Sequence, residues 1–283
     1  MTFKTAIAAT VATIALGSAA AADGHAATKG YALSGDGSRL IVMDSIAMPQ
    51  DARSVALSAP IRSIAWRPVT GELIGYADGK IVTIDTQSGT VVDQGATFME
   101  NAMIAGDAVV AFDFNNKIDA VRAVSSQGDN LVYFPGDFGD DKANSVRRFT
   151  SLAYADGDIS AGAEPLIFAN AYTNAIDGMK AGDTFQYALD ARANALVNLA
   201  NNAGTLDTIG LITIDGAPAD ILPEGGFDIV SPQEGTDAAY AVLHIDGQDS
   251  AGLYAIDLST GAATMLADLG MSGISSFAVS SGK

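Results

Sequence analysis

The turn sequence IDTQSGT at residues 84–90 returns far downstream as IDLSTGA at residues 256–262. Each copy ends a strand-like segment and places an Asp, Asp85 or Asp257, directly before a turn that closes on Gly. An echo over this distance is typical of repeat folds, in which one supersecondary unit recurs along the chain. An Asp in this position caps the amides of the turn, so we interpret both carboxylates as structural.

Longer units of strand, turn and strand recur around these turns. They are IAWRPVTGEL (64–73), FDFNNKIDAV (112–121), FDIVSP (227–232) and a weaker copy, ANAYTN (169–174). Their anchor positions, Trp66, Phe114, Tyr172 and Ile229, are separated by 48, 58 and 57 residues. Each interval holds four short strands with turns, which is the length of one propeller blade with some loop insertions.

The two ends of the chain complete the count. Residues 274–279 are strand-like with nothing after them to pair with, and residues 31–33 and 40–43 are strand-like with nothing before them. Placing these segments in one blade gives the strands at both ends of the chain a hydrogen-bonded neighbour. With units beginning near residues 61, 109, 166 and 226, the sequence predicts an all-β, β-propeller-like ring of about five blades. Six blades or a β-sandwich are the alternatives, and residues 181–201 fit a helix or a strand.

The first 22 residues have the pattern of a secretory signal peptide. Lys4 is the only charge before Asp23, residues 6–16 are apolar apart from two Thr, and residues 20–22 are all Ala. The apolar run is too short to span a bilayer, and small residues before Asp23 fit a cleavage site. We therefore expect a signal peptide at 1–22 cleaved after Ala22, a flexible leader at 23–29, one domain at 30–283, and a periplasmic or secreted protein.

Composition excludes several kinds of chemistry. The chain has no Cys, so disulfides, thiolate metal sites, Cys nucleophiles and covalently attached c-type haem are all excluded. A net charge of −18 opposes binding to nucleic acid and to anionic membranes. No later apolar run reaches 18 residues, so we expect no membrane span, and we expect a monomer. The acidic surface favours solubility, and a Ca²⁺ requirement is the sharper alternative.

One polar cluster is the best candidate for ligand binding. Its members are Asp113, Asn115, Arg122 and Asn130, with Asn170, Tyr172, Asn174 and Asp228 at matching positions in other units. Equivalent positions of successive blades converge on a propeller axis, where carboxylate and carboxamide oxygens can hold Ca²⁺. A metal so placed could activate water for lactone or ester hydrolysis. Asx turns and Asp–Arg pairs between loops are the structural interpretation, which we favour.

Arg122 is the most unusual member, because an Arg on an apolar strand is costly to bury unless a carboxylate such as Asp113 or Asp119 pairs with it. His244 lies on a strand without candidate partners, so we interpret it as an ordinary strand residue. The chain has no P-loop, no G-x-G-x-x-G after a strand, no G-x-S-x-G and no H-E-x-x-H, so neither a nucleotide cofactor nor a catalytic residue is predicted.

The same units resemble an exported bacterial family of unknown function, domain of unknown function 4394. The resemblance is carried by YALSGD (31–36), by the W-x-P-x-T-G-x-L unit at 66–73, by FDFN (112–115), RAVS (122–125), GDNL (128–131), AYTN (171–174), GTL (204–206) and LYAID (253–257). This sequence departs from the family pattern where Asn116 replaces a Pro, where Val132 replaces an Arg, and at residues 135–139. The resemblance implies a propeller-like exported protein and no particular reaction.

These observations favour an exported binding or interaction module of unknown ligand, either a small molecule or a protein. A Ca²⁺-dependent lactonase- or esterase-like hydrolase using the axial Asp and Asn side chains is one alternative. A structural surface or matrix protein is the other.

Expression of the full chain in a bacterial host should give a mature protein that begins at Asp23. Ala22→Arg should block processing, because signal peptidase requires a small residue there, whereas Ala26→Arg should not. N-terminal sequencing and intact mass measure the cleavage, and an exported protein that keeps Met1 would contradict the prediction.

Overall fold

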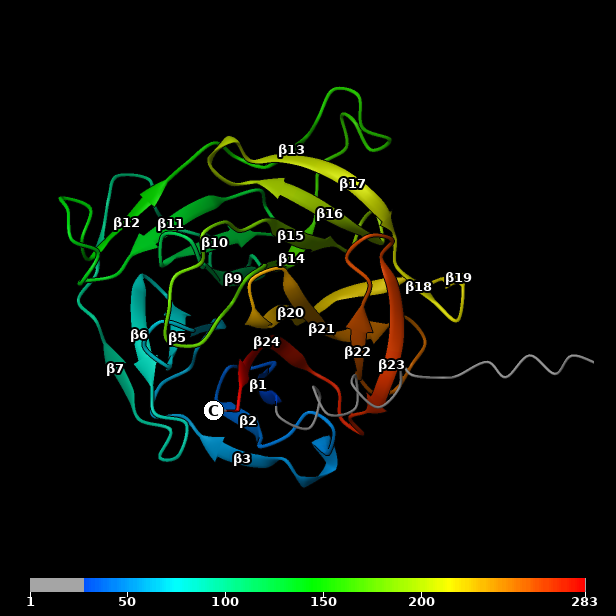
Figure 1. The fold of residues 1–283 in the computed structure, drawn as a ribbon, viewed down its shortest axis with the longest axis horizontal. Coiled ribbons are helices and arrows are strands. Elements are labelled where there is room, and N and C mark those ends of the chain that lie inside the picture. Colours follow the sequence, from blue (N-terminus) through cyan, green and yellow to red (C-terminus); the bar gives the residue numbers. More distant parts are fainter. Residues whose placement is uncertain (1–27, 283) are drawn as a thin grey trace, which may run out of the picture.

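The computed structural model describes residues 28–282, which form a ring of five small sheets around a central axis (Figure 1). The expected five-bladed β-propeller is confirmed, and neither six blades nor a β-sandwich is found. The expected signal peptide and residues 23–27 lie outside the described residues. The first strand begins at Thr28, so Thr28 and Lys29 belong to the sheet and not to the expected leader.

Each blade has four main strands, which follow one another from the axis outward. Blade 1 has β24 (Ile274–Ser281), β1 (Thr28–Ser34), β2 (Arg39–Met43) and β3 (Arg53–Ala56). Blade 2 has β4 (Ser63–Arg67), β5 (Glu72–Ala77), β6 (Lys80–Ile84) and β7 (Val91–Asp93). Blade 3 has β9 (Val110–Asn115), β10 (Ala120–Ser125), β11 (Asn130–Phe134) and β12 (Ser145–Arg148). Blade 4 has β14 (Ile167–Tyr172), β15 (Gln186–Asp190), β16 (Ala195–Ala200) and β17 (Thr205–Leu211). Blade 5 has β20 (Ile221–Gln233), β21 (Thr236–Ile245), β22 (Gly252–Ile256) and β23 (Ala262–Asp268).

Blade 1 closes the ring as expected, because its inner strand comes from the end of the chain. The red strand β24 lies beside the blue strand β1 (Figure 1). They pair antiparallel from Thr28 opposite Ser281 to Ser34 opposite Ile274, with one irregularity between Leu33 and Ser34. This pairing gives the strand at each end of the repeat a hydrogen-bonded neighbour.

Three outer edges gain an extra strand from the connection that enters the blade. The short strand β8 (Thr97–Phe98) runs parallel to β12, β13 (Ala153–Tyr154) runs parallel to β17, and β18 (Thr213–Ile214) runs parallel to β23. The last of these also forms a hairpin with β19 (Ala217–Pro218). Each connection thus pairs with the outer strand of the next blade before the chain returns to the axis, which covers an edge that would otherwise be open.

The hydrophobic core is divided among the five blade–blade interfaces. Leu33 and Leu40 of blade 1 pack with Ile64 of blade 2 in one cluster, and the four other large clusters join blades 2 and 3, 3 and 4, 4 and 5, and 5 and 1. The strands alternate side chains between two faces, and both faces of each blade are buried against a neighbour. Trp66 stacks on Tyr31 across one interface, with ring centroids 5.4 Å apart.

The two echoed turns join the third and fourth strands of blades 2 and 5. Asp85 Oδ1 accepts hydrogen bonds from the amides of Gln87 (2.9 Å) and Ser88 (2.7 Å), and Asp257 Oδ1 accepts one from the amide of Ser259 (2.8 Å). The structural role assigned to both carboxylates is confirmed. Residues 186–200, within the ambiguous segment, form strands β15 and β16.

The helices described are two 3-10 turns, η1 (Pro49–Asp51) and η2 (Asn201–Ala203). Within residues 28–282, no helix is long and apolar enough to cross a membrane.

Gly89 should be the more sensitive of two glycines with positive φ. Its φ is +74°, and a Cβ there would lie 2.0 Å from the carbonyl oxygen of Ala56 in blade 1, whereas Gly95 has a φ of +64° and open space around it. Gly95→Ala should cost about 1 kcal/mol through backbone conformation alone. Gly89→Ala should cost about 3 kcal/mol, because the neighbouring backbone must also move. Urea unfolding followed by the fluorescence of Trp66, the single tryptophan, measures both. Equal losses would contradict the proposed blade contact.

Candidate functional site

Five inner strands, β24, β4, β9, β14 and β20, surround the axis in that order and run in the same direction. Three cavities follow them. The first is lined by two turns and by residues near the starts of four of these strands, the second by residues further along all five, and the third by residues nearer their ends and by the β14–β15 connection. The axis is therefore open at one end and narrow beyond it.

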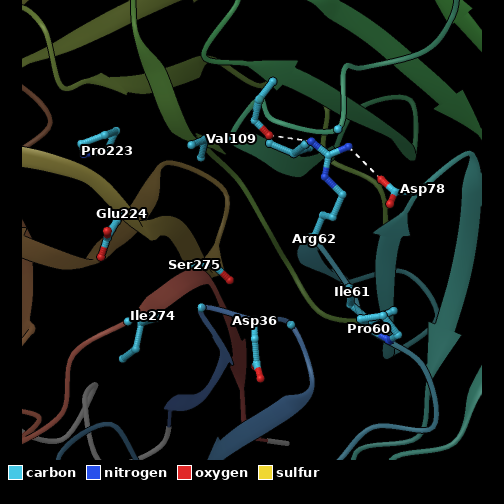
Figure 2. A pocket seen from close by; sticks show the side chains of 16 residues that line it. Asp36, Pro60, Ile61, Arg62, Asp78, Val109, Pro223, Glu224, Ile274 and Ser275 are labelled. Carbon is cyan, nitrogen blue, oxygen red and sulfur yellow. Dashed lines mark hydrogen bonds and ion pairs between the residues drawn. The ribbon is translucent and has the colours of Figure 1, made fainter.

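The open end is a cavity of about 480 Å³, which we call the funnel (Figure 2). Its walls come from the β1–β2 and β5–β6 turns, from the segments that lead into β4, β9 and β24, and from the first residues of β9, β20 and β24. Blades 1, 2, 3 and 5 all contribute. The lining residues labelled in Figure 2 are Asp36, Pro60, Ile61, Arg62, Asp78, Val109, Pro223, Glu224, Ile274 and Ser275.

Among residues 28–282, Arg62 is the one basic side chain that lines the funnel. Its Nη1 lies 3.0 Å from Asp78 Oδ1, and its Nη2 donates to the carbonyls of Ala105 (2.7 Å) and Ala108 (2.5 Å). The guanidinium also lies over the ring of Tyr76, 5.7 Å from its centroid. Arg62 thus ties blade 2 to the segment that leads into blade 3.

Asp36 is held in a fixed and ionised state at the rim. Its Oδ1 accepts hydrogen bonds from Ser34 Oγ (2.6 Å) and from the amide of Ser38 (3.0 Å). The bond from the Ser34 hydroxyl and those from Ser38 lower the pKa of Asp36 to about 2. The carboxylate is therefore negative throughout the neutral and mildly acidic range.

Glu224 stands above the buried His244. Its Oε2 lies 3.8 Å from His244 Nδ1, and His244 Nε2 accepts a hydrogen bond from the amide of Ile274 at 3.4 Å. Burial lowers the pKa of His244, against the opposing effect of Glu224. The imidazole is neutral at pH 7, so Glu224 keeps an uncompensated charge. His244 has the strand position predicted for it, but it also connects two walls of the funnel.

Beyond the funnel, the middle of the axis holds a space of about 10 Å³, which is the size of one water molecule. Asn170 lines it, is 1% exposed, and has no hydrogen-bond partner for Nδ2 or Oδ1 within residues 28–282. Ser63 and Ser276 also line it, and their hydroxyl oxygens are 3.1 Å apart. A buried polar group without a partner marks a position for an ordered water.

Asp113 and Asp228 line the third cavity, also about 10 Å³ in volume. Asp113 Oδ2 accepts the amide of Tyr172 on β14 at 2.7 Å, and Asp228 Oδ2 accepts the amide of Val279 on β24 at 2.6 Å. Each carboxyl therefore binds the inner strand of the next blade. Burial and the charge of Asp228 raise the pKa of Asp113 well above its usual range, and burial raises the pKa of Asp228 to about 7.

The β14–β15 connection, residues 173–185, contacts several blades at this end of the ring. Gly178 donates its amide to the carbonyl of Pro68 (2.9 Å), Ala181 to that of Asn116 (2.9 Å), and Ala175 to Ser231 Oγ (3.1 Å). Asp177 accepts a hydrogen bond from Ser281 Oγ. Ala175 and Asp177 also line the third cavity, so this connection walls it on the side away from the funnel.

Arg122, Asn130 and Tyr172 meet in a polar network between blades 3 and 4, away from the axial cavities. Arg122 donates from Nε to Tyr172 Oη (2.8 Å), from Nη2 to Asn202 Oδ1 (2.8 Å), and from Nη1 to Asn130 Oδ1. Asn130 Nδ2 donates to the carbonyl of Asn201 at 2.9 Å. The network fixes blade 4 against blade 3, so these three predicted ligand-binding residues are occupied with structural contacts.

Neither carboxylate expected to pair with Arg122 does so, although Asp113 lies opposite it in the β9–β10 ladder. Asp113 is bonded to the backbone of β14, and Asp119 pairs with Arg67, whose Nε and Nη2 lie 2.8 and 2.5 Å from its two oxygens. Arg122 instead meets neutral oxygens and the ring of Phe149, 5.7 Å from its centroid. Arg122 is 3% exposed, and its guanidinium depends on these hydrogen bonds for its burial.

Asn115 has the Asx-turn role that the structural interpretation predicted, whereas Asn174 bonds to the β20–β21 turn of blade 5. Asn115 Oδ1 accepts the amides of Lys117 and Ile118, each at 3.2 Å. Asn174 has a φ of +59°, and its Oδ1 accepts the amide of Gly235 at 2.7 Å. The structure thus brings only Asp113, Asn170 and Asp228 of the predicted site to the axial cavities.

Sequence reasoning missed the funnel residues Asp36, Arg62, Asp78 and Glu224. Asp36, Arg62 and Asp78 lie in turns and connections, Glu224 lies in the first half of β20, and none of them belongs to a motif. One signal was present: inner strands that run in the same direction place all the segments that enter them at one end of the ring. Within residues 28–282, no group of three or more His, Cys, Asp or Glu side chains could hold a metal ion. Carboxamide or carbonyl oxygens would have to complete a calcium site at Asp113 and Asp228.

The Asp113–Asp228 pair should make the protein less stable as pH rises from 5 to 7. The folded pKa values are raised, so the folded protein binds more protons than the unfolded chain in this range, and the free energy of unfolding falls as the folded carboxyls lose them. The fall should approach 1.4 kcal/mol per pH unit for each such group. Asp113→Asn keeps an acceptor for the Tyr172 amide and should flatten the curve, whereas Asp249→Asn, at an exposed site, should not. Urea unfolding across this range measures it, and a wild-type curve parallel to that of Asp113→Asn would refute the assignment.

Comparison with solved structures finds similarity at low identity. An auxiliary nutrient binding protein from Bacteroides ovatus has 11% identity and a TM-score of 0.44, and one from Bacteroides thetaiotaomicron has 9% identity and a TM-score of 0.44. Each match covers 75% of this chain and 55% of the other, so the chain spans about half the length of these proteins. A search of curated proteins returns no match. The family model described as Domain of unknown function (DUF4394) matches residues 41–278, and the chain belongs to this family.

Proposed function

We propose that this protein is an exported binding module that holds a small molecule, or a short segment of a protein, in the funnel. The observation that carries the proposal is the cavity of about 480 Å³ at one end of the axis, built by four of the five blades. This volume lies in the range of about 300–1,000 Å³ that is usual for small-ligand sites, and such sites combine apolar walls with a few polar groups.

The walls of the funnel are held by contacts that do not depend on a ligand. Ile61 donates its amide to the carbonyl of Gly37 at 3.0 Å, and Ser275 Oγ donates to the carbonyl of Ser34 at 3.1 Å. The contacts of Arg62 and His244 join the remaining walls. A site that is already formed loses little conformational entropy when a ligand enters, which favours affinity.

The hydrolase alternative is less well supported by the geometry. Asp113 and Asp228 would be its reactive carboxylates, but the space beside them is about 10 Å³. That volume accommodates one water and not a lactone or an ester. Both carboxyls hydrogen-bond to the backbone of the next blade, so they serve to hold neighbouring blades together. A purely structural surface or matrix protein, the third alternative, would have no ligand in the funnel.

Export to the periplasm or the medium is part of the proposal. It rests on the N-terminal pattern of residues 1–22, with its short apolar run and the small residues before Asp23. We propose that the mature protein acts as a monomer, since the pairing of β24 with β1 closes the ring within one chain.

Gly106→Trp should abolish ligand binding without unfolding the protein. Gly106 lines the funnel, and a Cβ there would meet no atom within 4 Å. The indole would therefore fill space that a ligand needs. Gly157→Trp is the matched control, because Gly157 is equally open and does not line the funnel.

The measurement is a thermal-shift panel of amino acids, short peptides, sugars and nucleosides. A compound present at 100 times its dissociation constant should stabilise wild type and Gly157→Trp by about 2.7 kcal/mol, which is several degrees in melting temperature, and should leave Gly106→Trp unchanged. A panel without binders, or binders that Gly106→Trp retains, would overturn the proposal.

A further inference from the structure

We propose that the funnel selects ligands that carry a protonated amine or a guanidinium beside an apolar group. The inference rests on the proposed function and goes further by naming the chemical class of the ligand. Three observations carry it: the balance of charge in the funnel, the contacts that already occupy Arg62, and the apolar residues between the charged ones.

The funnel has an excess of negative charge. Its charged lining residues are three carboxylates, Asp36, Asp78 and Glu224, and one guanidinium, Arg62. Two negative charges therefore remain uncompensated inside a concave site, where walls of low dielectric strengthen the field acting on a ligand. A cationic group is attracted into this field, and an anionic group is repelled from it.

The guanidinium of Arg62 already has partners within the protein. Its Nη1 is paired with Asp78, and Nη2 donates to two backbone carbonyls, those of Ala105 and Ala108. A ligand carboxylate would have to compete with Asp78 for this guanidinium, so Arg62 does not make the funnel a site for anions. It positions the wall between blades 2 and 3.

Glu224 and Asp36 are the carboxylates left for a ligand. Glu224 has His244 as its neighbour at 3.8 Å, and the neutral imidazole does not cancel its charge. Asp36 Oδ2 accepts a bond from Ser38 Oγ at 2.9 Å and retains lone pairs for a second donor. Both residues line the funnel, but Figure 2 shows the Asp36 carboxylate directed away from its centre, so Glu224 is the better placed of the two to form a charge-assisted hydrogen bond with an ammonium or guanidinium.

Apolar side chains lie between these charges. Pro60 lines the side of blade 2, Val109 the side of blade 3 and Pro223 the side of blade 5, and each keeps exposed surface, whereas Ile61 (2% exposed) and Ile274 (1% exposed) are buried in the core (Figure 2). A small inorganic cation would leave these surfaces wet. An organic cation would cover them and gain from the burial of apolar area. The combination fits a basic side chain of a peptide with apolar neighbours.

Three blocked tripeptides, acetyl-Leu-X-Leu-amide with X as Lys, Gln or Glu, test the inference by isothermal titration calorimetry on the full mature protein. The Lys peptide should bind about tenfold more tightly than the Gln peptide, which corresponds to one charge-assisted contact of about 1.4 kcal/mol. The Glu peptide should bind more weakly than the Gln peptide.

Glu224→Gln should reduce the preference for Lys over Gln at least threefold. Glu164→Gln, an exposed carboxylate outside the funnel, makes the same change in net charge and should leave the preference intact. Gly106→Trp should abolish binding of the Lys peptide, whereas general attraction to an acidic surface would survive this substitution.

Equal affinities for the three peptides, or a preference for Glu, would overturn the inference. If the peptides bound with either of these patterns and Gly106→Trp still abolished their binding, the funnel would remain the binding site. Only the inferred selectivity for cationic ligands would then be wrong. If none of the three peptides bound, the inference would also be overturned, and the broader thermal-shift panel would decide the proposed function.

Discussion

The pairing of β24 with β1 is the interaction on which the rest of the ring depends. It joins the two ends of the described chain in one blade, from Thr28 opposite Ser281 to Ser34 opposite Ile274. Every large hydrophobic cluster in the ring lies between two blades, so an open ring would expose two of these faces to water. The same pairing places β24 on the axis, where Ile274 and Ser275 line the funnel and Val279 bonds to Asp228. Closure therefore builds the core and the funnel together.

The inner strands present a different physical problem, because each pairs through its ladder on only one side. Amides that face the axis need acceptors from elsewhere, since a buried N–H without a partner is costly. Asp113 accepts the amide of Tyr172, and Asp228 accepts that of Val279. Ser276 Oγ accepts the amide of Ile64 at 3.1 Å. These polar side chains replace a ladder between blades. A repeat of Asp and Ser near the axis is thus expected from backbone hydrogen bonding alone, before any ligand is considered.

The period of the repeat, the turns and the closing of the ring could be predicted from the sequence, because they depend on local patterns of apolar residues, Gly and Asp. The predicted unit starts near residues 61, 109, 166 and 226 lie close to the starts of β4, β9, β14 and β20. The candidate site was predicted only in part. The matching positions of Asp113 and Asp228 in their repeat units indicate that both side chains reach the axis. They do not indicate that Arg122 pairs with Tyr172, Asn130 and Asn202. The partners of Arg122 depend on the angle between blades 3 and 4 and on the ion pair that Asp119 forms with Arg67. Neither can be deduced from a local sequence pattern.

The division of charge along the axis follows from the cost of burial. At the narrow end, Asp113 and Asp228 are enclosed, and burial favours their neutral forms. At the funnel, Asp36 and Glu224 are both exposed, and hydrogen bonds from Ser34 and Ser38 lower the pKa of Asp36. The field available to a ligand therefore comes from the funnel and not from the buried pair. This explains why the most conspicuous acidic repeat in the sequence lies in the scaffold, while the groups proposed to choose a ligand, Asp36 in a turn and Glu224 on β20, belong to no motif.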